Sequence, residues 1–238
     1  MIMQEWYPNN PKELKKLINK FLSQKIENLP KKINGLIVPH AGYFYSGSVA
    51  GTAYSLIKNN QKKAIVIGPS HYTPISGIIT TNKKEWQTPL GKIKIFNKCF
   101  KKSDIENEHS IKNQIPFLQF IKTPEIMPLM VGEINFDEAR IYAKKLSKIN
   151  AIFIFSTDLS HFKNYYDANL IDKNSIKIIE NLEIEKFNDI DACGYFPLMI
   201  LLELCKIKKT KPKLIQYKNS GDITGEKSSV VGYSSFYF

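Results

Sequence analysis

The segment AIFIFSTDLSH, residues 151–161, is decisive for the fold because five apolar residues lead directly into a polar stretch. A run this short and this apolar is typical of a strand that is covered on both faces. Similar runs stand at residues 35–38, 64–67 and 128–131, and helical spacing of apolar residues covers residues 136–149. Strands that alternate with helices predict a layered α/β fold with a largely parallel sheet.

Other segments carry end signals of helices and strands. Asn10 and Pro11 predict the N-cap and first residue of a helix. Ser46 is expected to cap a second helix that runs to about Lys58, and residues 111–121 are expected to form a third. The β-branched and aromatic tail, residues 229–238, predicts a late strand near a sheet edge.

The composition fits a globular chain and argues against several function classes. We expect one domain over residues 1–238, because no repeat or flexible linker interrupts the sequence. The net charge is +12, but Arg140 is the single arginine and the lysines are scattered, so we expect a solvated surface and no nucleic-acid site. No secretory signal or apolar span of membrane length is visible, and the cysteines lack C-x-x-C spacing. These features favour a reduced, cytoplasmic setting without membrane insertion.

Three of the four histidines directly follow predicted strands. His40, His71 and His161 come just after the runs at residues 35–38, 64–67 and 151–155. Ligands of open α/β sheets bind beyond the carboxyl ends of the strands, so we expect these imidazoles to share one crevice. Imidazole is the commonest protein ligand of borderline divalent metals, so the pattern predicts a metal site.

Two histidines rarely hold a metal alone, so a third donor is needed. Asp158, Glu108 and Cys193 are the candidates. Cys193 precedes an apolar segment with helical character, and a helix N-terminus would lower the pKa of its thiol and favour the thiolate. His109 stands apart from this pattern, ahead of the predicted helix at residues 111–121. Cys99 and Cys205 have no comparable setting, and we expect them to be structural.

An ordered set of short motifs makes the chain resemble the Memo family, which includes the archaeal and bacterial AmmeMemoRadiSam system protein B. The motifs span nearly the whole chain: Trp6-Tyr7-Pro8, Val38-Pro39-His40-Ala41-Gly42-Tyr43, Gly68-Pro69-Ser70-His71, Thr88-Pro89-Leu90-Gly91, Glu108-His109-Ser110-Ile111, Ser156-Thr157-Asp158-Leu159-Ser160-His161, Asp191-Ala192-Cys193-Gly194 and Val230-Val231-Gly232-Tyr233. The sequence departs from the family at its start, where the usual glycine-containing lead is absent.

That family is similar in fold to the class III extradiol ring-cleavage dioxygenases. The resemblance implies a layered α/β/α domain with a largely parallel or mixed central sheet. It implies that His40 and His71 are metal ligands, that Cys193 replaces the dioxygenase carboxylate, and that His161 stands where those enzymes have an acid–base histidine. Asp158 would line the same pocket. A thiolate softens the site, so iron or copper is expected and zinc is possible.

Three functions follow as hypotheses. The first is a metal-dependent redox or oxygenase-like enzyme, in which Asp158 orients His161 and the substrate contacts Tyr43, Glu108 and His109. The second is a noncatalytic module that binds a metal and an anion or peptide, with contacts from Trp6, Tyr7 and Trp86. The third is a zinc hydrolase. The resemblance also implies an AMMECR-type protein and a radical SAM enzyme as partners, and leaves the small-molecule or peptide ligand unknown.

Overall fold

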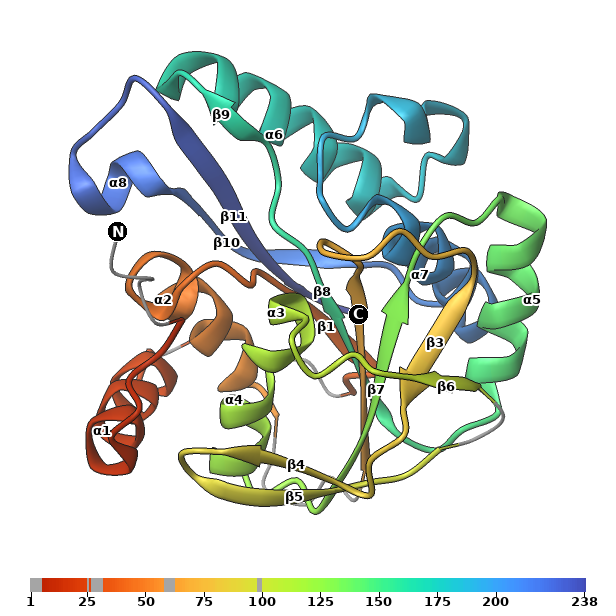
Figure 1. Ribbon diagram of the computed structural model, residues 1–238. Coiled ribbons are helices and arrows are strands. Elements are labelled where there is room, and N and C mark those ends of the chain that lie inside the picture. Colours follow the sequence, from red (N-terminus) through yellow and green to blue (C-terminus); the bar gives the residue numbers. More distant parts are fainter. Residues whose placement is uncertain (1–5, 25, 27–31, 58–62, 98–99) are drawn as a thin grey trace.

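The computed structural model describes the chain apart from residues 1–5, 25, 27–31, 58–62 and 98–99. A twisted sheet runs through the molecule with helices on both of its faces (Figure 1). The predictions for Lys58 and Cys99 lie outside the described residues. Among the described residues, no helix is long and apolar enough to cross a membrane.

One sheet contains all eleven described strands. They are β1 (Gly35–Val38), β2 (Lys63–Pro69), β3 (Ile78–Thr81), β4 (Glu85–Thr88), β5 (Gly91–Ile95), β6 (Lys101–Ser103), β7 (Glu125–Val131), β8 (Ile152–Ser156), β9 (His161–Lys163), β10 (Lys213–Asn219) and β11 (Val230–Tyr237). The main path runs β10-β11-β1-β8-β2-β7-β3-β6. All four predicted apolar runs are therefore strands, and they are neighbours.

The centre of the sheet is parallel and its margins are mixed. Strands β1, β8, β2 and β7 pair in parallel, whereas β11 is antiparallel to β1 and β3 is antiparallel to β7. Parallel pairing aligns Val38 with Ser156, so the carboxyl ends of β1 and β8 lie side by side. The largely parallel or mixed sheet is thus confirmed.

The tail forms strand β11, the second strand from one edge of the sheet, so the prediction of a late strand near a sheet edge is confirmed. Strand β11 is paired on both sides, with β10 outside it and β1 inside. The sequence of β10 is rich in lysine and lacks a clear apolar run, so it was not recognised as a strand. Lysines on an outer strand discourage pairing with other chains, and the opposite edge strand, β6, carries them too.

Eight helices cover the described sheet. They are α1 (Pro11–Leu22), α2 (Tyr43–Tyr54), α3 (His109–Lys112), α4 (Ile115–Phe120), α5 (Phe136–Ser147), α6 (Tyr165–Asn181), α7 (Tyr195–Lys208) and α8 (Ser220–Thr224), with a 3-10 turn at Ile184–Asp189. Asn10 caps α1 as predicted, because its side chain accepts hydrogen bonds from the backbone N–H groups of Lys12 and Glu13.

Alternate residues of the central strands build two cores. On β8, Phe153 and Phe155 pack with residues of α5, α6 and α7, whereas Ile152 and Ile154 pack with residues of α1, α2 and α4. The period of two in a strand sends successive side chains to opposite faces, which explains why the run is wholly apolar. The expected α/β/α layering is confirmed (Figure 1).

Two helix predictions need correction. Helix α2 begins at Tyr43 after Gly42, so Ser46 is not a cap, and its hydroxyl donates to the Ala41 carbonyl at 2.9 Å. The predicted helix at residues 111–121 is two short helices, α3 and α4, with Pro116 in the first turn of α4. The two residues at the break hold the loop after β1, because the side-chain amides of Asn113 and Gln114 donate to the carbonyls of His40 and Pro39.

Candidate metal centre

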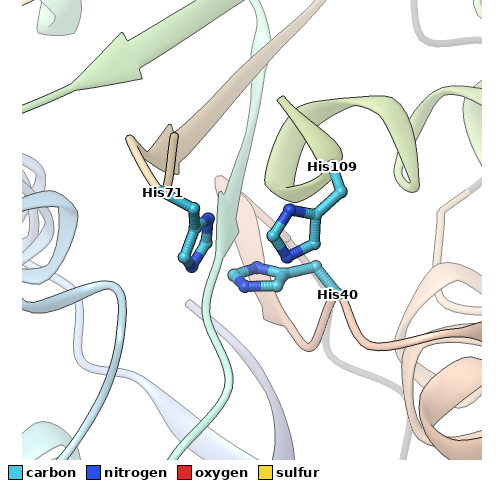
Figure 2. A group of neighbouring side chains, drawn as sticks. All are labelled: His40, His71 and His109. Atoms are coloured by element: carbon cyan, nitrogen blue, oxygen red, sulfur yellow. The ribbon is translucent and has the colours of Figure 1, made fainter. Parts of the chain in front are cut away.

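Three histidines meet at the carboxyl ends of the parallel strands. His40 lies two residues beyond β1, His71 two residues beyond β2, and His109 is the first residue of α3. One nitrogen from each ring lies within 4.8 Å of one nitrogen from each of the others. Figure 2 shows the three rings gathered from these separate segments. Of the three imidazoles expected to converge, His40 and His71 lie in this group, whereas His161 does not and His109 stands in its place.

Contacts far apart in the sequence bring His109 to this place. The Ser110 hydroxyl donates to the Pro69 carbonyl at 2.8 Å and so fastens the start of α3 to the end of β2. A Cβ atom on Gly68 would lie 2.5 Å from the Ser110 oxygen, so only glycine permits this approach. The sequence showed Glu108 and His109 next to a helix start, but gave no sign of which strand end α3 would reach.

A serine hydroxyl fixes the tautomer of His40. The Ser156 O–H donates to the Ser110 carbonyl at 2.6 Å, and Gln114 Nε2 donates to the same hydroxyl oxygen at 2.9 Å. His40 Nδ1 lies 3.0 Å from that oxygen, whose only proton is already used, so Nδ1 must carry a proton and donate it. The lone pair of His40 is therefore on Nε2, the nitrogen left for a metal.

A buried carboxylate orients His71. Glu108 accepts hydrogen bonds from the backbone N–H and the Nδ1–H of His71, both at 2.8 Å, and from the Ser110 N–H at 3.0 Å. Burial opposes ionisation, but these hydrogen bonds outweigh it and lower the pKa of Glu108 to about 2. Because Nδ1 of His71 is occupied by Glu108, Nε2 is the ring nitrogen left to face a metal.

Two aromatic residues hold His109. Its ring stacks on Trp6 with centroids 4.3 Å apart and an interplanar angle of 9°. The Tyr72 hydroxyl lies 2.9 Å from its Nδ1 atom. Burial and the neighbouring histidines lower the pKa of His109 to about 3, and burial lowers the pKa of His40 well below its usual range. Both imidazoles are therefore neutral near pH 7, as metal ligands must be.

Cys193 lies against the same cluster. Its Sγ atom is 3.2 Å from His40 Nε2 and accepts a hydrogen bond from the Asp158 N–H at 3.3 Å. The residue directly precedes Gly194, the N-cap of α7. The expected lowering of the thiol pKa is wrong, because burial and then Asp158 raise the pKa of Cys193. The three-donor group consists of histidines, so coordination by Cys193 stays a prediction.

Asp158 and His161 sit on the loop after β8. The Asp158 carboxylate accepts a hydrogen bond from the His40 N–H at 2.7 Å, and burial raises its pKa to about 6. His161 starts β9, is half-buried, and lies close enough to influence the pKa of both Asp158 and His40. The next residue, Phe162, is exposed with φ of 60°, a conformation that costs energy in a non-glycine residue. Acid–base roles for this pair stay predictions.

Asp172 braces this loop from α6 and was missed by sequence reasoning. Its wholly buried carboxylate accepts the Ser160 N–H at 2.9 Å and the Tyr217 O–H at 2.7 Å. Gly232 holds the same loop from strand β11, because its backbone exchanges hydrogen bonds with Leu159 and Ser160. A Cβ atom at Gly232 would lie 2.0 Å from Asp172, so glycine allows the two to approach, and together they form a clamp on the loop. The Gly232 motif near the C-terminus therefore serves to hold the loop that carries Asp158 and His161.

The remaining predicted contact residues have defined surroundings. Tyr43 is buried and its hydroxyl donates to the Asn113 carbonyl at 2.8 Å, while Asn113 Nδ2 donates to the His40 carbonyl at 2.7 Å. Trp86, predicted to contact an anion or peptide, is buried in the core. Contacts of Tyr43, Glu108 and His109 with a substrate stay predictions, since their neighbours do not identify a ligand.

The donor set fits a transition metal. It offers three imidazoles and an adjacent sulfur atom, and Ser156 and Glu108 occupy Nδ1 of His40 and of His71, so Nε2 of each faces the cluster. Nitrogen and sulfur donors suit iron, copper and zinc, whereas magnesium and calcium require oxygen. Hydrogen bonds behind the ligand rings are the usual support of a metal-binding histidine.

Comparison with known proteins identifies the family of the chain. The chain matches the family described as Memo-like protein over residues 4–237. A MEMO1 family protein of Nitrosopumilus maritimus is 30% identical, with 100% of this chain and 98% of the relative aligned. One from Methanobrevibacter smithii is 35% identical over 98% and 96%, and one from Thermoplasma volcanium is 34% identical over 97% and 94%. By sequence along almost its whole length, the chain belongs to the Memo family.

Proposed function

We propose that the three histidines and Cys193 bind one transition-metal ion, and that this pocket carries out metal-dependent oxidation of a small molecule. The observation that supports it most is the approach of nitrogen atoms from His40, His71 and His109 to within 4.8 Å of one another. Three side chains from distant segments, held in place by neighbouring polar groups, are costly to assemble unless they share a ligand.

Iron or copper is the proposed ion. A sulfur atom beside imidazole donors shifts preference toward these soft and redox-active metals. When bound, such an ion would supply one-electron redox chemistry and Lewis acidity to the pocket. The thiol of Cys193 must stay reduced to take part, which is consistent with a cytoplasmic setting.

The chain's own residues would orient and move protons. Asp158 supports the His40 backbone and, with its pKa raised to about 6 by burial, gains or loses a proton near neutral pH. His161 would exchange protons with the substrate, because it is half-buried and directly follows the loop that carries Asp158. The clamp formed by Asp172 and Gly232 would hold the loop backbone, and so keep Asp158 and His161 positioned beside the histidine cluster.

Anaerobic titration with Fe(II) and Cu(I) tests the site. Wild-type protein should bind one equivalent, and His40→Ala should abolish stoichiometric binding. Cys193→Ser and His109→Ala should each weaken binding at least tenfold, roughly the effect of losing one ligand or its support. His161→Ala is the matched control, since it removes a nearby imidazole outside the three-histidine group. Equal, weak binding by wild type and all variants would refute the site.

Zinc-dependent hydrolysis is a second candidate, favoured by the third histidine. Three imidazoles with one open position are a known donor set of catalytic zinc. Metal analysis of protein purified without added metal distinguishes the two: about one equivalent of zinc supports hydrolysis, whereas iron or copper supports oxidation. With Cu(II) bound, a visible thiolate charge-transfer band that disappears in Cys193→Ser would place the sulfur on the ion.

A further inference from the structure

Two sequence motifs meet at a cavity beside the metal centre, and one of them supplies Trp6, which stacks on His109. The cavity has a volume of about 540 Å³ and is lined by Trp6 and Tyr7 from the N-terminal segment, Gln87, Thr88 and Pro89 from the end of β4, and Lys112 from α3, with Asn9 at its margin. A volume of this size suits a small organic molecule.

The walls of this cavity are held in place without a ligand. The Trp6 carbonyl accepts a hydrogen bond from the Tyr43 N–H at 2.8 Å, and the Tyr7 ring lies 5.3 Å from that of Tyr43. At the end of β4, the Thr88 hydroxyl donates a hydrogen bond to the Gln119 side-chain oxygen and accepts one from the Leu90 N–H at 3.0 Å. A preformed cavity loses little free energy to ordering when it binds.

The charge of the lining selects the ligand. Lys112 is the one charged residue among the described lining residues, and it forms no ion pair with any carboxylate in the described chain. The two aromatic rings and Pro89 offer flat apolar surface, and the Gln87 amide adds a polar contact. Another cavity, of about 260 Å³, is lined by the carboxylates of Asp104 and Glu108 and so has the opposite charge.

The cavity shares a wall with the histidine cluster. Trp6 lines the cavity and stacks on His109. Lys112 lies three residues after His109 on α3, so both side chains project from the same side of that helix. A ligand in this cavity would therefore lie next to the side chains proposed to hold the metal.

We propose that this cavity binds a planar aromatic molecule with a single carboxylate, which pairs with Lys112 while the ring packs against Trp6 and Tyr7. Lys112 can form a charge-assisted hydrogen bond with one carboxylate, and no second cation stands among the described lining residues to neutralise a doubly charged phosphate. Its role as the substrate-recognition part of the metal centre rests on the proposed function, whereas the binding itself does not.

Calorimetry on chelator-treated protein tests binding separately from any metal chemistry. Benzoate should bind saturably, in the millimolar range or tighter for a ligand of this size. Benzyl alcohol and phenyl phosphate should each bind at least about tenfold more weakly than benzoate. Absence of saturable benzoate binding, or equal binding of benzyl alcohol, would overturn the proposal, and stronger binding of phenyl phosphate would overturn the choice of carboxylate.

Substitutions locate the binding. Lys112→Met should weaken benzoate binding at least about tenfold, because it removes the charge and keeps the length of the side chain. Lys102→Met, on the edge strand β6, makes the same change elsewhere and should bind as wild type. Trp6→Leu removes the aromatic wall from an independent segment and should also weaken binding, which keeps the test decisive if Lys112→Met fails to fold. Wild-type affinity in both cavity variants would refute this location.

Discussion

The histidine cluster has a buried side and an open side that are built differently. The side chain of His40 is 1% exposed, against 25% for His71 and 12% for His109. The buried side rests on the parallel sheet and its clamp, through Ser156, Asp158, Cys193 and Asp172. The open side rests on a short helix and loops, through Glu108, Tyr72 and Trp6.

This difference separates two tasks. Hydrogen bonds on the buried side have no water to replace them, so they fix the geometry and contribute to folding stability. Contacts on the open side leave the histidines accessible, so a ligand can reach them, and water can substitute for part of what a substitution removes. Substitutions on the buried side should therefore have larger effects than comparable ones on the open side.

The largest expected effect is on the clamp behind the buried side. Asp172→Ala leaves the buried Ser160 N–H and the Tyr217 O–H without their acceptor, and should lower the free energy of unfolding by about 3 kcal/mol. Urea-induced unfolding followed by circular dichroism measures this. Asp137→Ala, on an exposed turn of α5, is the control and should cost less than about 1 kcal/mol. Similar losses in both variants would remove the distinction drawn for Asp172.

The next effect concerns the serine behind His40. Ser156→Ala removes the acceptor of the His40 Nδ1–H and should weaken metal binding by about 10- to 100-fold. Competition with a chromophoric chelator measures the affinity. Ser147→Ala on α5, where the hydroxyl only bonds its own helix, should leave the affinity unchanged. Wild-type affinity in Ser156→Ala would show that the tautomer of His40 does not depend on this hydroxyl.

An intermediate effect is expected for Glu108, the most buried part of the open side. Its pKa of about 2 lies below the ordinary value of 4.5, so the ionised form stabilises the fold. That stabilisation is complete above pH 4.5 and is lost as the pH falls toward 2. Glu108→Gln should cost about 2 kcal/mol near neutral pH, and its difference from wild type should shrink between pH 4.5 and pH 2. Urea unfolding at several pH values measures this, and a difference independent of pH would contradict it.

The smallest effect provides a matched comparison with Ser156. Tyr72 also places a hydroxyl on the Nδ1 atom of a cluster histidine, but its side chain is on the surface, with 59% of the residue exposed. Tyr72→Phe should weaken metal binding by less than about threefold, because water can take the place of the hydroxyl. The same chelator competition applies. A loss as large as that of Ser156→Ala would erase the contrast between the two sides.

The sequence predicted the parts of this centre that depend on local pattern. Short apolar runs identified β1, β2, β7 and β8, and parallel strands necessarily end at one edge, so His40 and His71 were brought together correctly. Cys193 is one of three candidate donors in the sequence, motif resemblance selects it, and it does lie against His40.

The parts that were missed depend on contacts between distant segments. His109 reaches the cluster because Ser110 binds the end of β2, a packing event that no spacing in the sequence encodes. Asp172 lies in a helix with an ordinary mixture of polar and apolar residues, so its burial could not be distinguished from surface exposure. The edge strand β10 was missed because its lysines obscure the period-two pattern.

The single proton of the Ser156 hydroxyl has a consequence for stoichiometry. Since the neutral His40 ring keeps its hydrogen on Nδ1, it has no proton to give up on coordination. The Cys193 thiol, whose pKa burial raises, holds the hydrogen that an incoming cation must displace. The difference in protons released per ion between wild type and Cys193→Ser, from calorimetric heats in buffers of different ionisation enthalpy, therefore reports whether the sulfur is a ligand.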